Sequence, residues 1–318
     1  MQRTIRIGTR DSQLAVWQAT LVQELLKDAG VSSELVYMKS EGDIDTVTPL
    51  YALGVTGVFT KTLDAALLNN RIDIAVHSMK DVPTQLAQGI QQAAVLKRAS
   101  HKDILVYKND DDLKELGFES GEWKKTQNSK LTIATGSIRR VAQWLHRYPG
   151  HRTENLRGNV NTRLRKLEES HWNGAIFAAA GLERINLRPE KSIDLDWMLP
   201  APSQGAIMVV CRKEDEYAFE ACQSFNDERT ALCTKIEKDF LRVLMGGCST
   251  PISALAEIDG NTVSFRGNIC SPDGCDLMEI NLERDKEKSE FLGEEAAHQI
   301  LETEKAQQII QTVRNGKG

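Results

Sequence analysis

Lys80 and Asp81 stand side by side after an apolar run, residues 72–76, that is typical of a short buried strand. At the end of such a strand a lysine can bind anions, and a carboxylate can stabilise a cation that develops during a reaction. Asp81 could instead be a turn residue before Pro83, which explains the aspartate but not the adjacent lysine. His77 fits a packed or hydrogen-bonded strand residue at least as well as a functional one.

A set of arginines follows the predicted strands at their C-terminal ends. Arginine binds carboxylate or phosphate through two parallel hydrogen bonds, and ligands of open αβ sheets bind at this edge. Each arginine taken alone is better explained as a surface charge on a helix. Their shared position predicts one cleft for a substrate with many carboxylates. The set comprises Arg10, Arg139, Arg140, Arg157, Arg163 and Arg184.

Cys248 lies in a loop framed by glycines and a proline, residues 246–251. The two glycines before the sulfur admit backbone angles that side chains forbid and leave space for a bulky group, while Pro251 stiffens the exit. This pattern indicates an attachment point. The alternative is a helix that ends in glycine and is followed by a buried structural cysteine.

The composition indicates a globular protein of two or three domains. Of 318 residues, 41% are hydrophobic and 27% charged, and no apolar run approaches the roughly 20 residues that cross a bilayer. The net charge of −5, without a block of like charge, argues against nonspecific nucleic-acid binding. The N-terminus enters a strand pattern at once, so we expect no export signal and a cytoplasmic protein.

Six cysteines occupy the last third of the chain, and without an export signal we expect reduced thiols. Cys270 and Cys275 flank a turn sequence, so we predict that they face each other near the end of a hairpin as structural residues. No second pair of ligands accompanies them, and metal binding is not expected. The sequence contains no motif for nucleotide binding, for a zinc-protease helix or for a serine nucleophile elbow.

Strand and helix patterns alternate over the first two thirds of the chain and predict mostly parallel, wrapped sheets. The first series begins with a strand at 4–9 and a helix from 12 to near 30. A polar stretch, 109–130, reads as an insertion or as a boundary before a second series. That series begins like the first, with a strand that leads into a Ser-capped helix carrying a tryptophan, Trp17 in one and Trp144 in the other. Two domains of like plan are predicted.

A meander after the cysteine loop predicts a third, smaller α+β domain. Its expected elements are strands at 253–258, 262–269 and 277–283 and a helix at 290–301. Residues 199–210 are expected to cross back between the first two domains. The predicted domains are residues 1–104 with 206–224, residues 105–205, and residues 225–318.

Five segments, in this order, make the chain similar to the porphobilinogen deaminase family, whose members are also called hydroxymethylbilane synthases. The segments are residues 7–12 with Leu14, Ala15 and Gln18; residues 76–83; residues 137–140; residues 156–160 with Thr162 and Arg163; and residues 246–248. The resemblance covers nearly the full length. Any one segment could occur by chance, but the five together specify this family.

The resemblance implies an α/β fold of two domains like type II periplasmic binding proteins, with a smaller C-terminal α+β domain that carries a cofactor cysteine. It implies a cytosolic, monomeric transferase of haem biosynthesis. Such an enzyme condenses four porphobilinogen molecules with loss of ammonia and releases hydroxymethylbilane by hydrolysis. Its cofactor is dipyrromethane, two pyrrole units joined by a thioether to the position of Cys248. No metal, nucleotide or vitamin is implied.

The family's functional residues map onto this chain position by position. Asp81 matches the catalytic carboxylate, which faces the pyrrole nitrogens and stabilises their positive character. Residues implied to bind the cofactor and growing chain are Lys80, Ser137, Arg139, Arg140 and Arg163. Residues implied to bind or line the site of the incoming substrate are Arg10, Ser12, Phe59, Arg157, Arg184 and Gln204.

The chain departs from the family's pattern in three places. The loop at residues 52–57 lacks the lysines that many members carry, so a lysine role in chain growth does not transfer. Ser203 replaces a glycine that is usual before Gln204. Gly136 replaces a serine that is common before Ser137, which alters the hydrogen bonds open to a carboxylate.

Two other functions are compatible with parts of the sequence. A binding module of two αβ lobes that close on a small anion explains the arginines but not Cys248, and it would ordinarily carry an export signal or a helix-turn-helix. A dehydratase or transferase with Cys248 as a free nucleophile would show unmodified mass and a thiol sensitive to alkylation. Intact mass separates both from the deaminase, which carries two extra pyrrole units.

Overall fold

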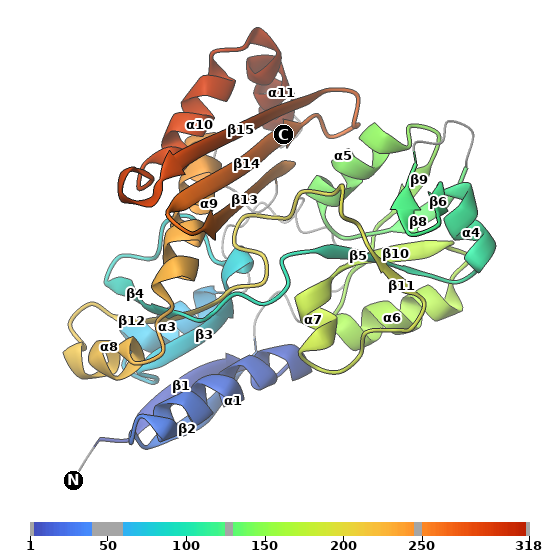
Figure 1. The fold of residues 1–318 in the computed structure, drawn as a ribbon. Helices are drawn as coiled ribbons and strands as arrows, with labels where there is room; N and C mark the ends of the chain where they lie inside the picture. Colours follow the sequence, from blue (N-terminus) through green and yellow to red (C-terminus); the bar gives the residue numbers. More distant parts are fainter. Residues whose placement is uncertain (1–2, 40–59, 125–129, 245–249, 316–318) are drawn as a thin grey trace.

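The computed structural model describes residues 3–39, 60–124, 130–244 and 250–315. These residues form two αβ lobes, each built around a five-stranded sheet, and a smaller lobe around a three-stranded antiparallel sheet (Figure 1). The predicted fold class is confirmed. Within the described ranges, no helix has both the length and the apolar character that a membrane crossing requires.

The first sheet has the strand order β2-β1-β3-β12-β4. Its strands are β1 (Ile5–Arg10), β2 (Ser33–Met38), β3 (Ile74–Ser78), β4 (Ile90–Val95) and β12 (Ile207–Arg212). β1 runs parallel to β2 and β3, whereas β12 runs antiparallel to both β3 and β4. The prediction of a mostly parallel sheet is confirmed for four of these strands, and β12 is the exception because it returns from the second lobe and enters this sheet from the opposite end.

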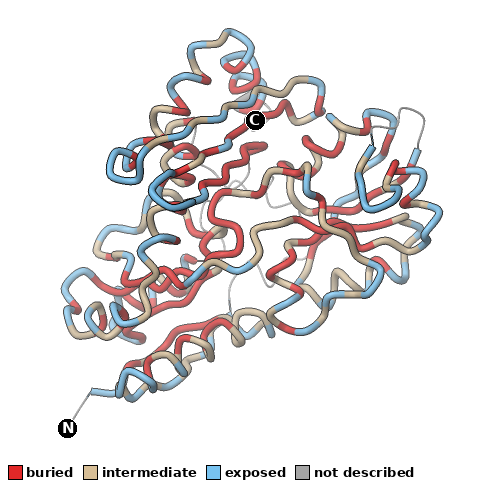
Figure 2. Tube along the Cα trace, viewed as in Figure 1, coloured by how far each residue is buried: buried red, intermediate tan, exposed pale blue. Residues whose placement is uncertain are grey.

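Helices cover both faces of the first sheet. On one face α1 (Gln13–Asp28) and α8 (Glu216–Gln223) pack against the strands, and on the other lies α3 (Lys61–Leu68). Ser12 caps α1, since its hydroxyl accepts a hydrogen bond from the amide of Ala15 at 3.4 Å. The strands of both large sheets are mostly buried (Figure 2). Their ends, rather than their faces, are therefore the part left to bind a ligand.

The second sheet has the strand order β11-β5-β10-β8-β9. Its strands are β5 (Asp103–Tyr107), β8 (Thr132–Ala134), β9 (Arg152–Glu154), β10 (Gly174–Ala178) and β11 (Ser192–Asp194). β8, β9 and β10 are parallel, and β5 runs antiparallel to β10 and β11. This sheet is mixed for the same reason as the first, because β5 arrives from the other lobe.

The polar stretch at residues 109–130 is an insertion in the second lobe. Its described part forms α4 (Asp110–Glu115) and a short hairpin of β6 (Phe118–Glu119) and β7 (Glu122–Trp123). It is not the boundary between the two series, because β5 precedes it and already belongs to the second sheet. β5 begins at Asp103, ahead of the predicted domain limit after residue 104, and the domain limits stay a prediction.

The repeated start that the sequence shows is present in both lobes. β8 leads into α5 (Ile138–Arg147) as β1 leads into α1, and Ser137 holds the N-cap position of α5. The two tryptophans differ in their surroundings. Trp144 is fully buried against Tyr148, whereas Trp17 is half-buried below the guanidinium of Arg184, 5.8 Å from its ring centre. Two further helices, α6 (Val160–Glu169) and α7 (Ala179–Glu183), complete this lobe.

The third lobe packs helices on one face of its meander. Its elements are α9 (Glu228–Leu244), β13 (Ile252–Asp259), β14 (Thr262–Cys270), β15 (Leu277–Asp285), α10 (Leu292–Leu301) and α11 (Glu304–Asn315). The three strands and α10 follow the predicted pattern. The β14–β15 hairpin also corrects one prediction: Cys270 is buried, whereas Cys275 at the turn is exposed, so the two thiols do not share one environment.

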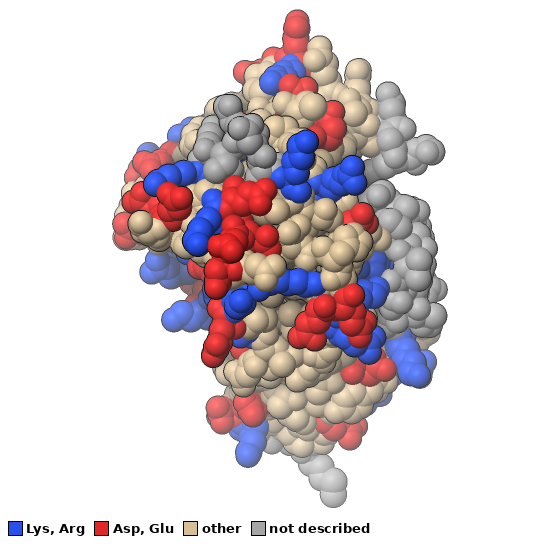
Figure 3. Space-filling model, turned by 90° about the vertical axis from the view of Figure 1, so that its right-hand side faces the viewer, with Lys and Arg blue, Asp and Glu red and all other residues tan. Residues whose placement is uncertain are grey.

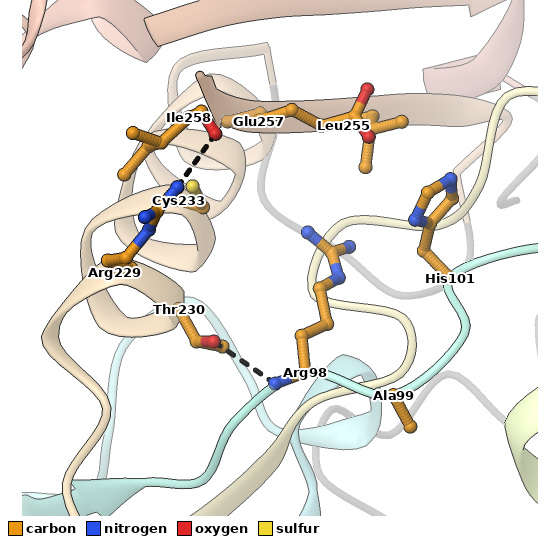
Figure 4. A pocket seen from close by; sticks show the side chains of 10 residues that line it. Arg98, Ala99, His101, Arg229, Thr230, Cys233, Leu255, Glu257 and Ile258 are labelled. Carbon is orange, nitrogen blue, oxygen red and sulfur yellow. Dashed lines mark hydrogen bonds between the residues drawn. The ribbon is translucent and has the colours of Figure 1, made fainter. Parts of the chain in front are cut away.

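Two crossing segments, residues 96–102 and 195–206, join the large lobes beside α9. The buried carboxylate of Glu237 on α9 ties them together. It accepts hydrogen bonds from Arg98 at 2.5 and 3.1 Å, from the amide of Ser203 at 2.6 Å and from the amide of Ala256 at 2.8 Å. A cavity of about 240 Å³ opens beside this junction, between the crossing segment, α9 and β13 (Figure 4). None of the predicted site residues lines it.

Candidate active site

In the first lobe, the end of β3 presents Lys80 and Asp81. The strand ends in a single 3₁₀ turn, Met79–Asp81, which is fixed by the buried side chain of Met79 and by a hydrogen bond from its amide to the carbonyl of Ala206 at 3.0 Å. Arg10 ends the neighbouring strand β1 at the same edge. The predicted strand-end position of Lys80 and Asp81 is confirmed, although the strand extends to Ser78.

In the second lobe, the predicted arginines follow parallel strands at their carboxyl ends. Arg139 and Arg140 lie in the first turn of α5 after β8, Arg157 follows β9, and Arg184 follows β10 and α7. Arg163, on α6, donates to the carbonyl of Gly158 at 2.7 Å. The hydroxyl of Ser137 makes no capping bond to α5.

Contacts between the lobes bring the two edges together. Lys80 donates from Nζ to Oε1 of Gln204 at 3.2 Å, and Gln204 donates from Nε2 to Oδ1 of Asp103 at 2.9 Å. Arg184 of the second lobe donates to the carbonyl of Gly205 at 2.7 Å, just before β12 of the first. The structure therefore connects Lys80 and its neighbour Asp81 to the arginine-bearing edge.

Asp103, which the sequence analysis missed, is the buried carboxylate at the centre of this group. Its Oδ1 accepts a hydrogen bond from Nε of Arg140 at 3.0 Å and lies 2.8 Å from Nη2 of the same arginine. Its Oδ2 forms an ion pair with Arg139 at 2.7 Å. Burial acts to raise the pKa of Asp103, but Arg139 and Arg140 hold it at about 2. The available signal was a charged residue at the start of an apolar strand, since such residues are rarely buried without a partner.

Cations outnumber carboxylates in this region. Burial and then repulsion from Arg140 lower the pKa of Lys80 to about 8. Burial, Arg140 and Arg157 lower the pKa of Arg163 to about 10, against an opposing effect of Asp81. Together with the groups that shift these two pKa values, the set comprises the cations Lys80, Arg139, Arg140, Arg157 and Arg163 and the carboxylates Asp81 and Asp103. Within this described set, five cations stand against two carboxylates, an excess of positive charge that suits a polyanionic ligand.

Arg140 and Arg139 differ in how many of their guanidinium nitrogens have a hydrogen-bond partner within the described protein. Each of the three guanidinium nitrogens of Arg140 is engaged, by Asp103 or by the carbonyl of Ile176. Arg139 pairs with Asp103 and donates to the carbonyl of Leu199, but its buried Nε has no hydrogen-bond partner among the described residues. An unsatisfied buried donor of this kind is available to a ligand carboxylate.

Other predicted site residues lie at the same edges or outside the described ranges. Arg10 is close enough to buried His77 to lower its pKa, after burial itself, to about 4, and His77 is a packed strand residue. The hydroxyl of Ser12 is already engaged as a helix cap. Phe59, Cys248 and the loop at 52–57 lie outside the described residues.

Local backbone geometry accounts for Gly136 in place of serine, but it favours the glycine that Ser203 replaces. Ser203 has φ of 63°, in the left-handed region that favours glycine, and its buried hydroxyl has no hydrogen-bond partner in the described structure. A Cβ at Gly136 would lie 2.4 Å from the carbonyl oxygen of Leu156. A serine at residue 136 would therefore require the backbone after β9 to move.

Figure 3 shows one face of the molecule outside this site. On the face drawn in Figure 3, basic and acidic side chains are intermixed. Among the described residues, no group of three or more His, Cys, Asp and Glu side chains is placed to hold a metal ion. The cluster around Asp103 is thus the feature that distinguishes the region between the two lobes.

Profiles of two protein domains match the chain. Residues 5–220 match the domain described as "Porphobilinogen deaminase, dipyromethane cofactor binding domain", and residues 231–302 match "Porphobilinogen deaminase, C-terminal domain". The chain belongs to the porphobilinogen deaminase family. The predicted family, the transferase activity and the dipyrromethane cofactor are confirmed. Family membership decides against both the anion-binding module and the enzyme with a free nucleophilic cysteine.

Individual relatives agree over the whole length. A porphobilinogen deaminase of Acidithiobacillus ferrooxidans is 37% identical, over 99% of this chain and 100% of its own. The chloroplastic porphobilinogen deaminase of Oryza sativa is 42% identical, over 87% of this chain and 77% of its own. Among solved structures, a nutrient binding protein from Burkholderia cenocepacia bound to methionine is 14% identical over 70% of this chain and 91% of its own, with a TM-score of 0.42.

Proposed function

We propose that this porphobilinogen deaminase performs its reaction between the carboxyl edges of the two large sheets, with Asp81 as the catalytic carboxylate. The observation that carries this assignment is the bonded path from Lys80 through Gln204 to Asp103 and its two arginines. It places the residue next to Asp81 in contact with the cationic edge of the other lobe.

The residues at these edges fit an acidic pyrrole cofactor. Dipyrromethane carries carboxylate side chains, and the excess of cations and the unpartnered Nε of Arg139 provide donors for them. The residues that would hold it are Lys80, Ser137, Arg139, Arg140 and Arg163, and the thioether would form at Cys248. When bound, the cofactor supplies the nucleophilic pyrrole carbon to which the first substrate is joined.

Asp81 is the group that we assign to charge stabilisation. Loss of ammonia from porphobilinogen leaves a positive charge spread over the pyrrole ring, and a carboxylate beside the ring nitrogen lowers the energy of that cation. Asp81 makes no hydrogen bond or ion pair with other described residues. Its carboxylate is therefore available to a ring N–H, while nearby cations hold the substrate's own carboxylates.

The substrate-binding assignments divide into direct and indirect roles. We assign Arg10, Ser12, Arg157 and Arg184 to the carboxylates of the incoming porphobilinogen, with Phe59 lining the same cleft. Gln204 acts through its neighbours, because its Oε1 accepts from Lys80 and its Nε2 donates to the carbonyl of His101 and to Asp103. Its amide thereby sets the position of the Lys80 ammonium.

Replacement of Asp81 tests the assignment. Asp81→Asn keeps the size of the side chain and removes its charge, so we expect kcat to fall by roughly 10²- to 10³-fold, the usual effect of losing one transition-state partner. Cofactor content, measured with acidic dimethylaminobenzaldehyde, should be unchanged. The control is Asp111→Asn, which removes a carboxylate exposed on α4. Near-normal turnover of Asp81→Asn would refute the catalytic role.

We also assign a monomeric state and a cytoplasmic location. The large exposed apolar side chains among the described residues are scattered over separate elements, at Tyr37, Leu68 and Phe291, and form no common patch. Sedimentation at the chain mass of 35.5 kDa is expected, and a stable dimer would contradict the assignment. Location varies among relatives, since the rice relative is chloroplastic, and cell fractionation tests it here.

A further inference from the structure

Asp103 differs from the residues assigned so far because its carboxylate contacts no solvent and serves three partners. Its side chain is fully buried, and it lies opposite Ala178 at the carboxyl end of β10. From there it reaches Arg139 and Arg140 on α5 and Gln204 on the returning segment. The Asp103 carboxylate thus links β5 to residues 195–206, the segment that returns to the first lobe.

The two carboxylates within the cationic cluster are used in opposite ways. Asp103 takes both arginines of α5, whereas Asp81 forms no ion pair with the described residues. Arg139 and Arg140 are almost fully buried, so without Asp103 they would carry uncompensated charge in a poorly solvated site. Asp81 and Asp103 are the two carboxylates that act on the pKa of Lys80.

We propose that Asp103 is a positioning residue that holds the guanidinium groups of Arg139 and Arg140 and directs them toward the carboxylates of the cofactor. Arg139 shows the consequence of this arrangement. One of its nitrogens is fixed by Asp103 and another by the carbonyl of Leu199, while Nε has no hydrogen-bond partner among the residues that the structure describes. Its orientation is thus set by the protein before any acidic ligand arrives, which lowers the entropic cost of binding.

The same carboxylate acts on Lys80 through Gln204. Gln204 can present Oε1 to Lys80 only while its Nε2 faces acceptors, and Asp103 and the carbonyl of His101 are those acceptors. Loss of the Asp103 charge would therefore disturb two sets of cofactor-binding cations together. The role that we assign to Asp103 rests on the proposed function.

A pair of matched variants separates positioning from structural support. Asp103→Asn and Asp73→Asn each neutralise one fully buried carboxylate held by arginines, and Asp73 lies at the other edge of the first sheet. We expect both variants to lose thermal stability. Only Asp103→Asn should carry less dipyrromethane, measured by intact mass, and show kcat/KM lower by roughly 10- to 100-fold, as when a partner that orients a binding group is removed.

Asp103→Glu provides the rescue test and covers the case in which Asp103→Asn fails to fold. It keeps the charge and displaces the carboxylate by one methylene, so we expect cofactor content between wild type and Asp103→Asn and a raised KM for porphobilinogen. Wild-type cofactor content and KM in both Asp103 variants, or in Asp103→Glu when it alone folds, would overturn the proposal. Equal loss of cofactor in Asp73→Asn would also overturn it. Failure of the proposed function would show instead as normal turnover of Asp81→Asn.

Discussion

Two clusters of arginine and aspartate lie at different ends of the molecule and differ in what they leave unpaired. At the amino edge of the first sheet, Asp73 is bound by Arg3, Arg6 and Arg212, and Asp215 shares Arg3 and Arg212. β3 separates this edge from Lys80 by five residues, about 17 Å of extended chain.

The cluster at Asp73 satisfies its own charges, whereas the cluster at Asp103 does not. Despite burial, hydrogen bonds from Arg6 and Arg3 hold the pKa of Asp73 well below its usual range. Around Asp103, the buried Nε of Arg139 has no hydrogen-bond partner among the described residues. A closed ion cluster can stabilise the fold, while an open one offers donors to a ligand. Both clusters are rich in arginine and aspartate, so composition alone does not distinguish the closed cluster from the open one.

The largest contrast is expected between Arg139→Ala and Arg6→Ala. Arg139→Ala removes a donor from the open cluster, so cofactor assembly should fail in most chains and specific activity should fall by more than about 100-fold. Arg6→Ala removes one arm of the closed cluster and should lower the free energy of unfolding by about 1 kcal/mol, without loss of cofactor. Intact mass and thermal denaturation measure the two effects. Full dipyrromethane in Arg139→Ala would contradict the assignment.

A smaller contrast is expected in the response to pH. The pKa of Lys80 is lowered to about 8, so its ammonium is lost as the pH rises through 8. Cofactor acquisition by the apoprotein should therefore weaken above pH 8, and Lys80→Arg should remove that dependence because arginine stays charged. The closed cluster contains only arginine and aspartate, which keep their charges over this range. A pH-independent wild type would refute the role of Lys80.

As the pH rises, the effect of Lys80 on stability is opposite to its effect on cofactor binding. The folded chain binds the Lys80 proton less tightly than the unfolded chain, since burial lowers the pKa of Lys80. This unfavourable contribution is full below pH 8 and disappears as the pH rises toward the usual lysine pKa. Apoprotein stability attributable to Lys80 should therefore increase between pH 8 and 10, while cofactor acquisition decreases. Denaturant titration of wild type and Lys80→Arg measures the difference.

The smallest contrast concerns two residues with positive φ, one beside each cluster. Ser203 is buried at φ of 63° with an unpartnered hydroxyl, so Ser203→Gly should stabilise the protein by about 1 kcal/mol. Asn70 has φ of 54°, but its side-chain oxygen accepts from Arg6 at 3.1 Å, and asparagine tolerates this region. Asn70→Gly should therefore give no gain. Melting temperatures of the two variants measure these effects. An unchanged melting temperature for Ser203→Gly would show that the backbone at Ser203 is not strained.

The predicted elements were correct where burial of a single element imposes a period on the sequence. The amphipathic helix at α1, the buried strand at β3 and the meander of the third lobe were all recognisable, because each residue's exposure depends on its own element. The predicted parallel direction holds for all strands of the two large sheets except β12 and β5. The direction of a strand depends on where the chain crosses between lobes, and the residues within the strand do not indicate that crossing.

The sequence by itself determined the family, the fold class and the residues that approach the carboxyl edges, since Lys80, Asp81 and the arginines lie in short segments of fixed spacing. Only the tertiary structure decided which of these charges pair. Asp103 and Arg140 are 37 residues apart, and Lys80 and Gln204 are 124 apart. The first pair forms because β5 and α5 pack in one lobe, and the second because the chain crosses twice between the lobes; ionic contacts follow distance in space rather than distance along the chain.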